Sequence, residues 1–206
     1  RYTLCFSLIV TLAAGIRMHT LLGAFEAGHR YRAAAWPQVT GKAGAAQRQV
    51  DTFAAFIVDT VPALVSSEFT ACFHIEGRTG NIRPDTIQWA ADPLMDTIVP
   101  DGERLFMAHF PDHPLTHPPH QLTETRVLRL SDAIPSAEWR RLGMYIDFFR
   151  PARIEHEVGF LLTPPPYEIC DGVTLYRGGR DYSERELTLI EAARPHIVQA
   201  FANVQA

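Results

Sequence analysis

An alternation of apolar and polar side chains over residues 69–76 constrains the fold more than any other feature of the sequence. Apolar residues take every second position and mostly polar ones the positions between them: Phe69, Ala71, Phe73 and Ile75 against Thr70, Cys72, His74 and Glu76. This period of two is typical of a strand with one buried face. Residues 77–81 (GRTGN) favour a tight turn. A return strand over 82–90 is therefore predicted, and Pro84 places it at a sheet edge.

Helices are expected where the apolar period changes to three and four residues. Residues 47–65 show such a face, which Pro62 ends or kinks, and a short helix is predicted over 103–109. Ser136 is a suitable N-cap for a helix to Arg141 that Gly143 would stop. A second apolar turn is expected over 144–149. The last helix begins at the Ser183–Glu186 capping box and extends toward the chain end.

Further strands are predicted over 126–131, 157–163 and 173–177. Hairpin-like neighbours of this kind favour antiparallel pairing, with the helices packed on the sheet. The predicted fold class is therefore α+β, of the GAF/PAS type: a mostly antiparallel sheet covered by helices, with a long C-terminal helix.

Composition narrows the class of protein. The chain has 206 residues, 47% hydrophobic and 20% charged, with a net charge of −4. This balance is typical of a globular domain with a real core, and it argues against nucleic-acid binding by these residues themselves, which needs a dense positive face. The cysteines Cys5, Cys72 and Cys170 form no CxxC pair, so neither a disulfide framework nor a cysteine zinc site is indicated. We expect a cytoplasmic protein that needs no cofactor.

The N-terminal segment, residues 1–45, is expected to lie outside the folded domain of residues 46–206. Residues 4–16 form an apolar run between Arg1 and Arg17. The run is shorter than the roughly 20 residues that cross a membrane, so no membrane span is expected. We interpret the segment as a leader from a misplaced start or from cloning; a buried helix and a signal sequence are the alternatives.

Several short motifs occur in an order that resembles one family. They are RGGRDYSEREL (177–187), LIEAARPHIVQA (189–200), HPL (113–115), LSD (130–132), EWRRL (138–142) and YIDFFRP (145–151). Together, over residues 47–206, they resemble the GAF-like sensory N-terminal domain of LuxR-type helix-turn-helix transcriptional regulators. The resemblance implies a domain that senses an unknown small molecule or protein partner. It also implies transmission through the last helix to a DNA-binding domain, which is absent from this sequence.

A sensory domain needs apolar space with a few polar groups. Aromatic residues are the candidates to line such a pocket: Phe73, Trp89, Phe106, Trp139, Tyr145, Phe149 and Tyr176. Tyrosine and tryptophan combine ring surface with a hydrogen-bonding tip that can orient a ligand. The alternative is that these rings only fill the core.

The histidines His109, His113, His117 and His120 are weak candidates for a metal site. Four prolines around them rule out a helical H-x-x-x-H site, and the HPL motif suggests packing for His113. A metal-dependent enzyme using this loop is the third function considered. Motifs of nucleophilic catalysis are absent, so no enzyme activity is expected. Glu155 and Glu157 should share one strand face opposite His156, and both carboxylates are expected to be solvated.

The last helix carries an apolar seam of output residues, Leu187, Ile190, Ile197 and Phe201, together with Val204. Steps of three, four and seven favour a helix pair, and hence a possible homodimer. Arg194 interrupts the seam, and Pro195 should bend the helix. Two alternatives stay open: the seam packs on the domain's own sheet, or the domain is a dimerisation and protein-interaction module without a ligand.

Overall fold

The computed structural model describes residues 53–58, 60–76, 81–82, 88–89, 102–115, 126–163 and 169–205. The described strands form a six-stranded antiparallel sheet in the order β2-β1-β6-β5-β4, with β3 also paired to β1. The strands are β1 (Phe69–Glu76), β2 (Asn81–Ile82), β3 (Gln88–Trp89), β4 (Leu128–Arg129), β5 (His156–Leu161) and β6 (Ile169–Arg177). The α+β fold class predicted from the sequence is confirmed.

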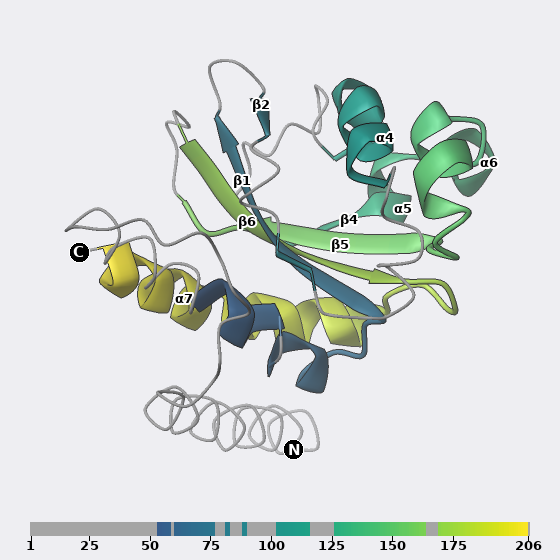
Figure 1. Ribbon diagram of the computed structural model, residues 1–206. Helices are drawn as coiled ribbons and strands as arrows, with labels where there is room; N and C mark the ends of the chain where they lie inside the picture. Colours follow the sequence, from purple (N-terminus) through teal and green to yellow (C-terminus); the bar gives the residue numbers. More distant parts are fainter. Residues whose placement is uncertain are drawn as a thin grey trace, which may run out of the picture.

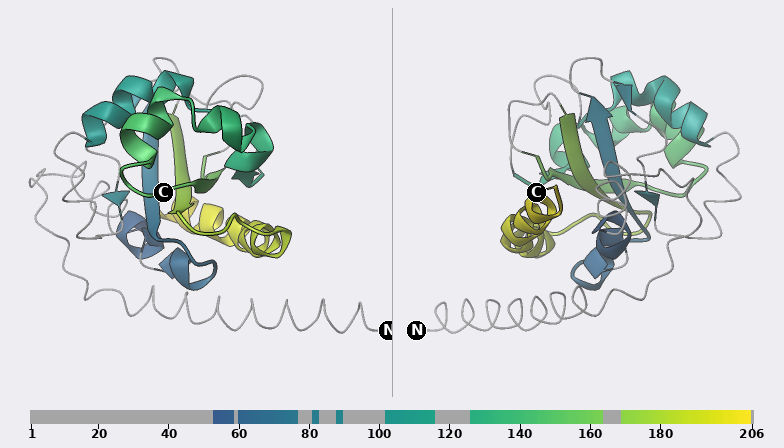
Figure 2. Two further views of the ribbon diagram at one scale, coloured as in Figure 1. Left: turned by 90° about the vertical axis from the view of Figure 1, so that its right-hand side faces the viewer. Right: turned by 60° about the vertical axis from the view of Figure 1, so that its left-hand side comes forward.

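Helices cover both faces of this sheet (Figures 1 and 2). One face carries α4 (Gly102–His109), η3 (Phe110–Asp112), α5 (Leu130–Ala133), α6 (Ser136–Trp139) and η4 (Tyr145–Phe149). The other face carries the helical residues 53–58, η1 (Val61–Ala63) and the long helix α7 (Glu184–Gln205). The domain is therefore built in three layers, and the sheet separates two cores.

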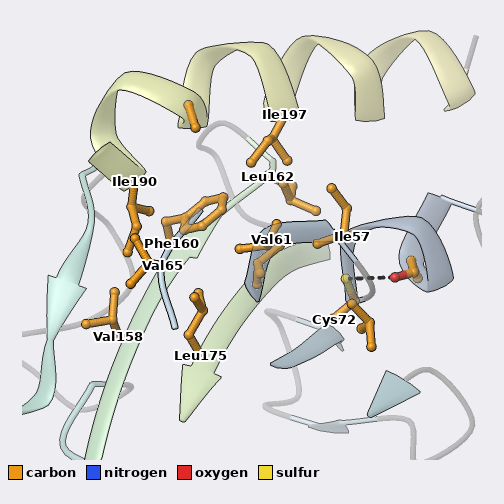
Figure 3. Packing of buried hydrophobic residues seen from close by; sticks show 14 of the residues in the cluster. Ile57, Val61, Val65, Cys72, Val158, Phe160, Leu162, Leu175, Ile190 and Ile197 are labelled. Carbon is orange, nitrogen blue, oxygen red and sulfur yellow. Dashed lines mark hydrogen bonds between the residues drawn. The ribbon is translucent and has the colours of Figure 1, made fainter. Parts of the chain in front are cut away.

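The core under α7, termed the aliphatic core, is mainly aliphatic, although it includes aromatic rings such as Phe160 (Figure 3). Val158, Phe160, Val173 and Leu175 of the sheet face α7 and the N-terminal helix, and each is at most 1% exposed. Cys72 belongs to this core, and burial raises the pKa of its thiol well above the usual range. A buried, protonated thiol is unreactive, so Cys72 serves packing.

The period-two prediction for residues 69–76 is confirmed by β1, because Phe69 and Ala71 lie in the core of the opposite face from Cys72. The predicted return strand over 82–90 is present as β2 and β3, paired with β1 at Ile75 and Ala71. Residues 83–87 lie outside the described part. The N-terminal extension, residues 1–45, does so as well.

Two local predictions were wrong. The strand expected over 126–131 gives way to α5 at Leu130, and Pro135 rather than Ser136 is the N-cap of α6. The helix that begins near Ser136 does end before Gly143, because α6 ends at Trp139, and Gly143 is the first residue of the next helical segment. A Cβ on Gly143 would also lie 2.4 Å from Cε1 of His109, so α4 packs against this backbone.

The capping box of α7 is confirmed. The Ser183 N–H donates to Oε2 of Glu186 at 2.8 Å, and the Glu186 N–H donates to Oγ of Ser183 at 3.4 Å. Pro195 lies inside α7, which continues to Gln205. Among the described residues, no helix combines the length and the apolar character needed to cross a membrane.

Gly178 and Gly179 provide a matched test of close packing at the exit of β6. A Cβ on Gly178 would lie 2.0 Å from the carbonyl oxygen of Arg153, whereas a Cβ on Gly179 meets nothing within 4 Å. Gly178→Ala should therefore lower the free energy of unfolding by about 1–3 kcal/mol, and Gly179→Ala should change it by less than about 0.5 kcal/mol. Urea denaturation of both variants measures this, and equal losses would contradict the packing described.

Candidate functional site

An aromatic cluster lies between the sheet and the helices of residues 102–149. We define it as the buried residues Phe106, Trp139, Tyr145, Phe148, Phe149 and Tyr176. Ring centroids are 5.0 Å apart for Trp139 and Phe149, and 5.7 Å apart for Phe149 and Tyr176. The rings meet at steep angles, an arrangement that aromatic pairs prefer.

The structure brings together six of the seven predicted pocket residues. Phe73 is half-buried at the margin of the cluster, with its ring lying over Gly172. The backbone of Trp89 lies in β3, but its side chain is outside the described part. Phe148 was missed, although η4, a π-helix, buries it together with Tyr145 and Phe149. Positions 145, 148 and 149 are spaced three and four residues apart, as on one helical face, so the sequence pattern could have identified Phe148.

A buried polar pair, His113 and Glu157, borders the aromatic cluster. Nε2 of His113 lies 3.0 Å from Oε2 of Glu157, and both side chains are 3% exposed. The Leu115 N–H donates to Nδ1 of His113 at 3.3 Å. Because Nδ1 accepts, the proton is on Nε2, and the imidazole is neutral and donates to the carboxylate.

The expectation that Glu157 is solvated was therefore wrong. The prediction that Glu155 and Glu157 share one strand face, opposite His156, was right. Glu157 and Glu155 both bond to the helical layer, since the Tyr145 hydroxyl donates to Glu155 at 2.5 Å, whereas His156 lies 3.4 Å from Asp181. Strand β5 is covered on both faces, so a charged residue inside it becomes buried together with a partner.

The cluster also contains an unsatisfied donor. Trp139 is only 2% exposed, and its indole Nε1 has no hydrogen-bond partner among the described residues. Burial, with the nearby Glu157 charge, raises the pKa of Tyr176 well above its usual value, so this tyrosine is a neutral phenol. A buried donor without a partner is uncommon in native proteins, but Nε of Arg177 and the Tyr182 hydroxyl on the α7 face are also unpaired among the described residues. The aromatic lining, with few polar groups, is what makes this layer the candidate ligand site.

The histidine candidates are divided between different partners. Nε2 of His109 lies 2.8 Å from Oδ2 of Asp147, while His113 is committed to Glu157. Within the described ranges, no three His, Cys, Asp or Glu side chains are grouped as a metal site would require. His117 and His120 lie outside those ranges, so the metal hypothesis is untested.

On the opposite face, Glu186 anchors the start of α7. Arg177 donates to both its carboxylate oxygens at 2.9 and 3.1 Å, and Arg180 does so at 3.0 and 2.8 Å. The bonds from Arg177, with those from Ser183 and Arg180, hold the pKa of Glu186 well below its usual range. Arg177 also donates to the Ser66 carbonyl, which ties the N-terminal helical segment into the same network.

The output residues of α7 pack on the domain's own sheet. Ile190, Ile197 and Phe201 are buried and Leu187 is partly buried in the aliphatic core, with Phe201 5.3 Å from the Phe53 ring. The structure favours packing of this seam within the domain over the predicted helix pair, because the seam is already covered by the sheet.

Comparisons with known proteins reveal a similarity of fold. No family model matches the chain, and no curated protein does. Among solved structures, the ligand-binding (LBD) domain of VqsR from Pseudomonas aeruginosa matches with a TM-score of 0.51 and 13% sequence identity. The match covers 80% of this chain and 97% of that one. At this identity the similarity concerns the fold.

The pairing of His113 with Glu157 can be measured against a matched neighbour. Glu157→Ala leaves a buried N–H without a partner and should cost about 1–3 kcal/mol in unfolding free energy. Glu155 lies on the same face two residues earlier, and its side chain is 28% exposed. Glu155→Ala should therefore lower the free energy of unfolding by less than about 1 kcal/mol. Urea denaturation gives both values. Equal costs would show that the pair contributes nothing beyond a surface contact.

The lowered pKa of Glu186 predicts a pH dependence. A carboxyl whose pKa is lower in the folded state stabilises the fold above its ordinary pKa of 4.5 and loses that contribution as the pH falls below it. The free energy of unfolding of wild type should therefore exceed that of Glu186→Gln by about 3 kcal/mol near neutral pH. This difference should shrink as the pH falls below 4.5. The exposed Glu184→Gln (82% exposed) is the control. A pH-independent difference would refute the assignment.

Proposed function

We propose that this chain is the ligand-sensing domain of a LuxR-type transcriptional regulator. In this proposal a small molecule binds in the aromatic cluster between the sheet and the helices of residues 101–150. Binding favours one of two packings of the helical layer, and α7 transmits the change to a helix-turn-helix DNA-binding domain of the full-length regulator. The protein acts in the cytoplasm and is not an enzyme.

One observation carries the proposal: neighbouring residues of the same strand face the ligand layer and the output helix. In β6, Tyr176 belongs to the aromatic cluster, while the next residue, Arg177, binds Glu186 of α7. In β5, Glu157 pairs with His113 on one face, and Val158 packs in the core under α7 on the other. Movement of the helical layer therefore reaches α7 through a single strand.

The fold similarity to the ligand-binding domain of VqsR, a LuxR-type regulator, supports the same class of function. The order of motifs between residues 113 and 200 is a second, independent support. A dimerisation module without a ligand is less well supported, because the apolar seam of α7 is covered by its own sheet.

Thermal unfolding against a metabolite library tests the proposal. A ligand at 100 times its Kd stabilises by about 2.7 kcal/mol, which should raise the Tm by roughly 5–10 °C for a domain of this size. Phe149→Ala should abolish the shift. Ile146→Ala, a change at the 36% exposed residue of the same π-helix, should preserve it.

A library in which no compound raises the Tm, together with a solid core in the aromatic cluster, would contradict the ligand model. The domain would then recognise a protein partner.

A further inference from the structure

The imidazole of His113 lies among four aromatic rings. Its centroid is 6.1 Å from the rings of Trp139 and Phe149, and 6.3 Å from those of Phe106 and Phe110. These rings come from three separate helical segments, η4, α6 and the α4–η3 unit. His113 thus occupies the centre of an aromatic cage.

Glu157 closes the cage on the side of the sheet. It is buried, and among the described ion pairs its partner is His113 and no arginine or lysine. That imidazole is neutral, because Nδ1 accepts the Leu115 N–H. Among the described residues, no cation therefore balances this carboxylate inside the cage, and its charge is felt by Tyr176, whose pKa it raises further.

Aromatic rings, of which Phe110 is stacked on His113, and a buried carboxylate form an environment that suits a nitrogen cation. Ring faces attract a cation electrostatically, more so when water is excluded. A hydrogen bond from a charged N–H donor to a carboxylate is also about twice as strong as a neutral one. The His113 side chain is a neutral, tethered group with the outline of such a ligand: a flat ring that directs one N–H at Glu157.

We infer that the cage around Glu157 binds a compact organic cation with N–H donors, an amidine, guanidinium or imidazolium compound, which replaces His113 on the carboxylate. This inference rests on the proposed function, because it names the class of the sensed molecule. In the ligand-free state His113 fills the cage and ties residues 113–115 to β5. In the bound state the cation takes the carboxylate, and the segment of His113 is released.

This exchange supplies the differential affinity that a sensor needs. A ligand shifts a two-state equilibrium only when it binds one state better, and here the cation binds only the state with His113 displaced. Its apparent Kd rises by the reciprocal of the fraction of molecules in that state. Removing the His113 side chain should therefore tighten binding.

The experiment uses imidazole and methylguanidinium as probes and thiophene as a control ring without an N–H donor. Wild type, His113→Ala, Glu157→Gln and the double variant are titrated and followed by Tm and by the indole N–H signal of Trp139. The chain has three tryptophans, so this signal is assigned by its loss in Trp139→Phe.

Both probes should bind His113→Ala saturably, at least about tenfold more tightly than thiophene, which corresponds to about 1.4 kcal/mol. Wild type should bind them saturably but at least about tenfold more weakly, with the Trp139 signal shifted. Glu157→Gln should remove the preference over thiophene in both backgrounds. If His113→Ala does not fold alone, refolding yield with imidazole against thiophene replaces the Tm, and rescue by imidazole is expected.

Two results would overturn the inference: no saturable binding of either probe to wild type, or equal binding of thiophene and the N–H probes to His113→Ala. The first result would show that His113 is a permanent core residue. The second would show that the cage binds rings without regard to an N–H donor. Neither would refute the proposed sensory function, which fails only when no library compound raises the Tm of wild type.

Discussion

The antiparallel pairing of β6 with both β1 and β5 is the constraint on which the remaining structure depends. It aligns Phe69, Tyr176 and Glu157 as one row across the sheet, all directed at the helical layer. The adjacent residues, Leu175 and Val158, are directed at α7. Since the side chains of a strand alternate, one register fixes both the lining of the aromatic cluster and the surface on which α7 packs.

Two buried carboxylates, one on each face of the sheet, differ in how their charge is compensated. Glu186 receives hydrogen bonds from two arginines and Ser183, so its charge is fully compensated and it fixes the start of α7. Glu157 receives one from a neutral imidazole. A charge compensated so weakly is costly to bury. The face with α7 is thus anchored by several charged hydrogen bonds, whereas the carboxylate on the opposite face has one neutral partner, which is the basis of the ligand exchange proposed above.

Local sequence signals predicted the elements whose causes are local. The capping box at Ser183 and Glu186 and the alternation over 69–76 depend on residues a few positions apart, and both are present as predicted. The aromatic residues of the candidate site were identified from the sequence by residue type alone. The structure places most of these rings, from residues 106 to 176, in one layer. Whether they bind a ligand stays a prediction.

Features that a distant segment decides were missed. The close approach of α4 to Gly143 depends on the His109 ring, and the burial of Glu157 depends on His113, 44 residues earlier. An isolated sequence contains no signal of these pairings, although the nearby HPL motif hinted at a packing role for His113.

Coupling between the two faces is the central claim, and a double-mutant cycle measures it most directly. Phe149→Leu, in the aromatic cluster, and Glu186→Gln, at the start of α7, are combined, and unfolding free energies are obtained from urea titrations. Distant independent sites add within about 0.5 kcal/mol. The account predicts a coupling energy above that value, carried through β6. Additive effects would contradict it, because the output helix would then be independent of the layer proposed to bind the ligand.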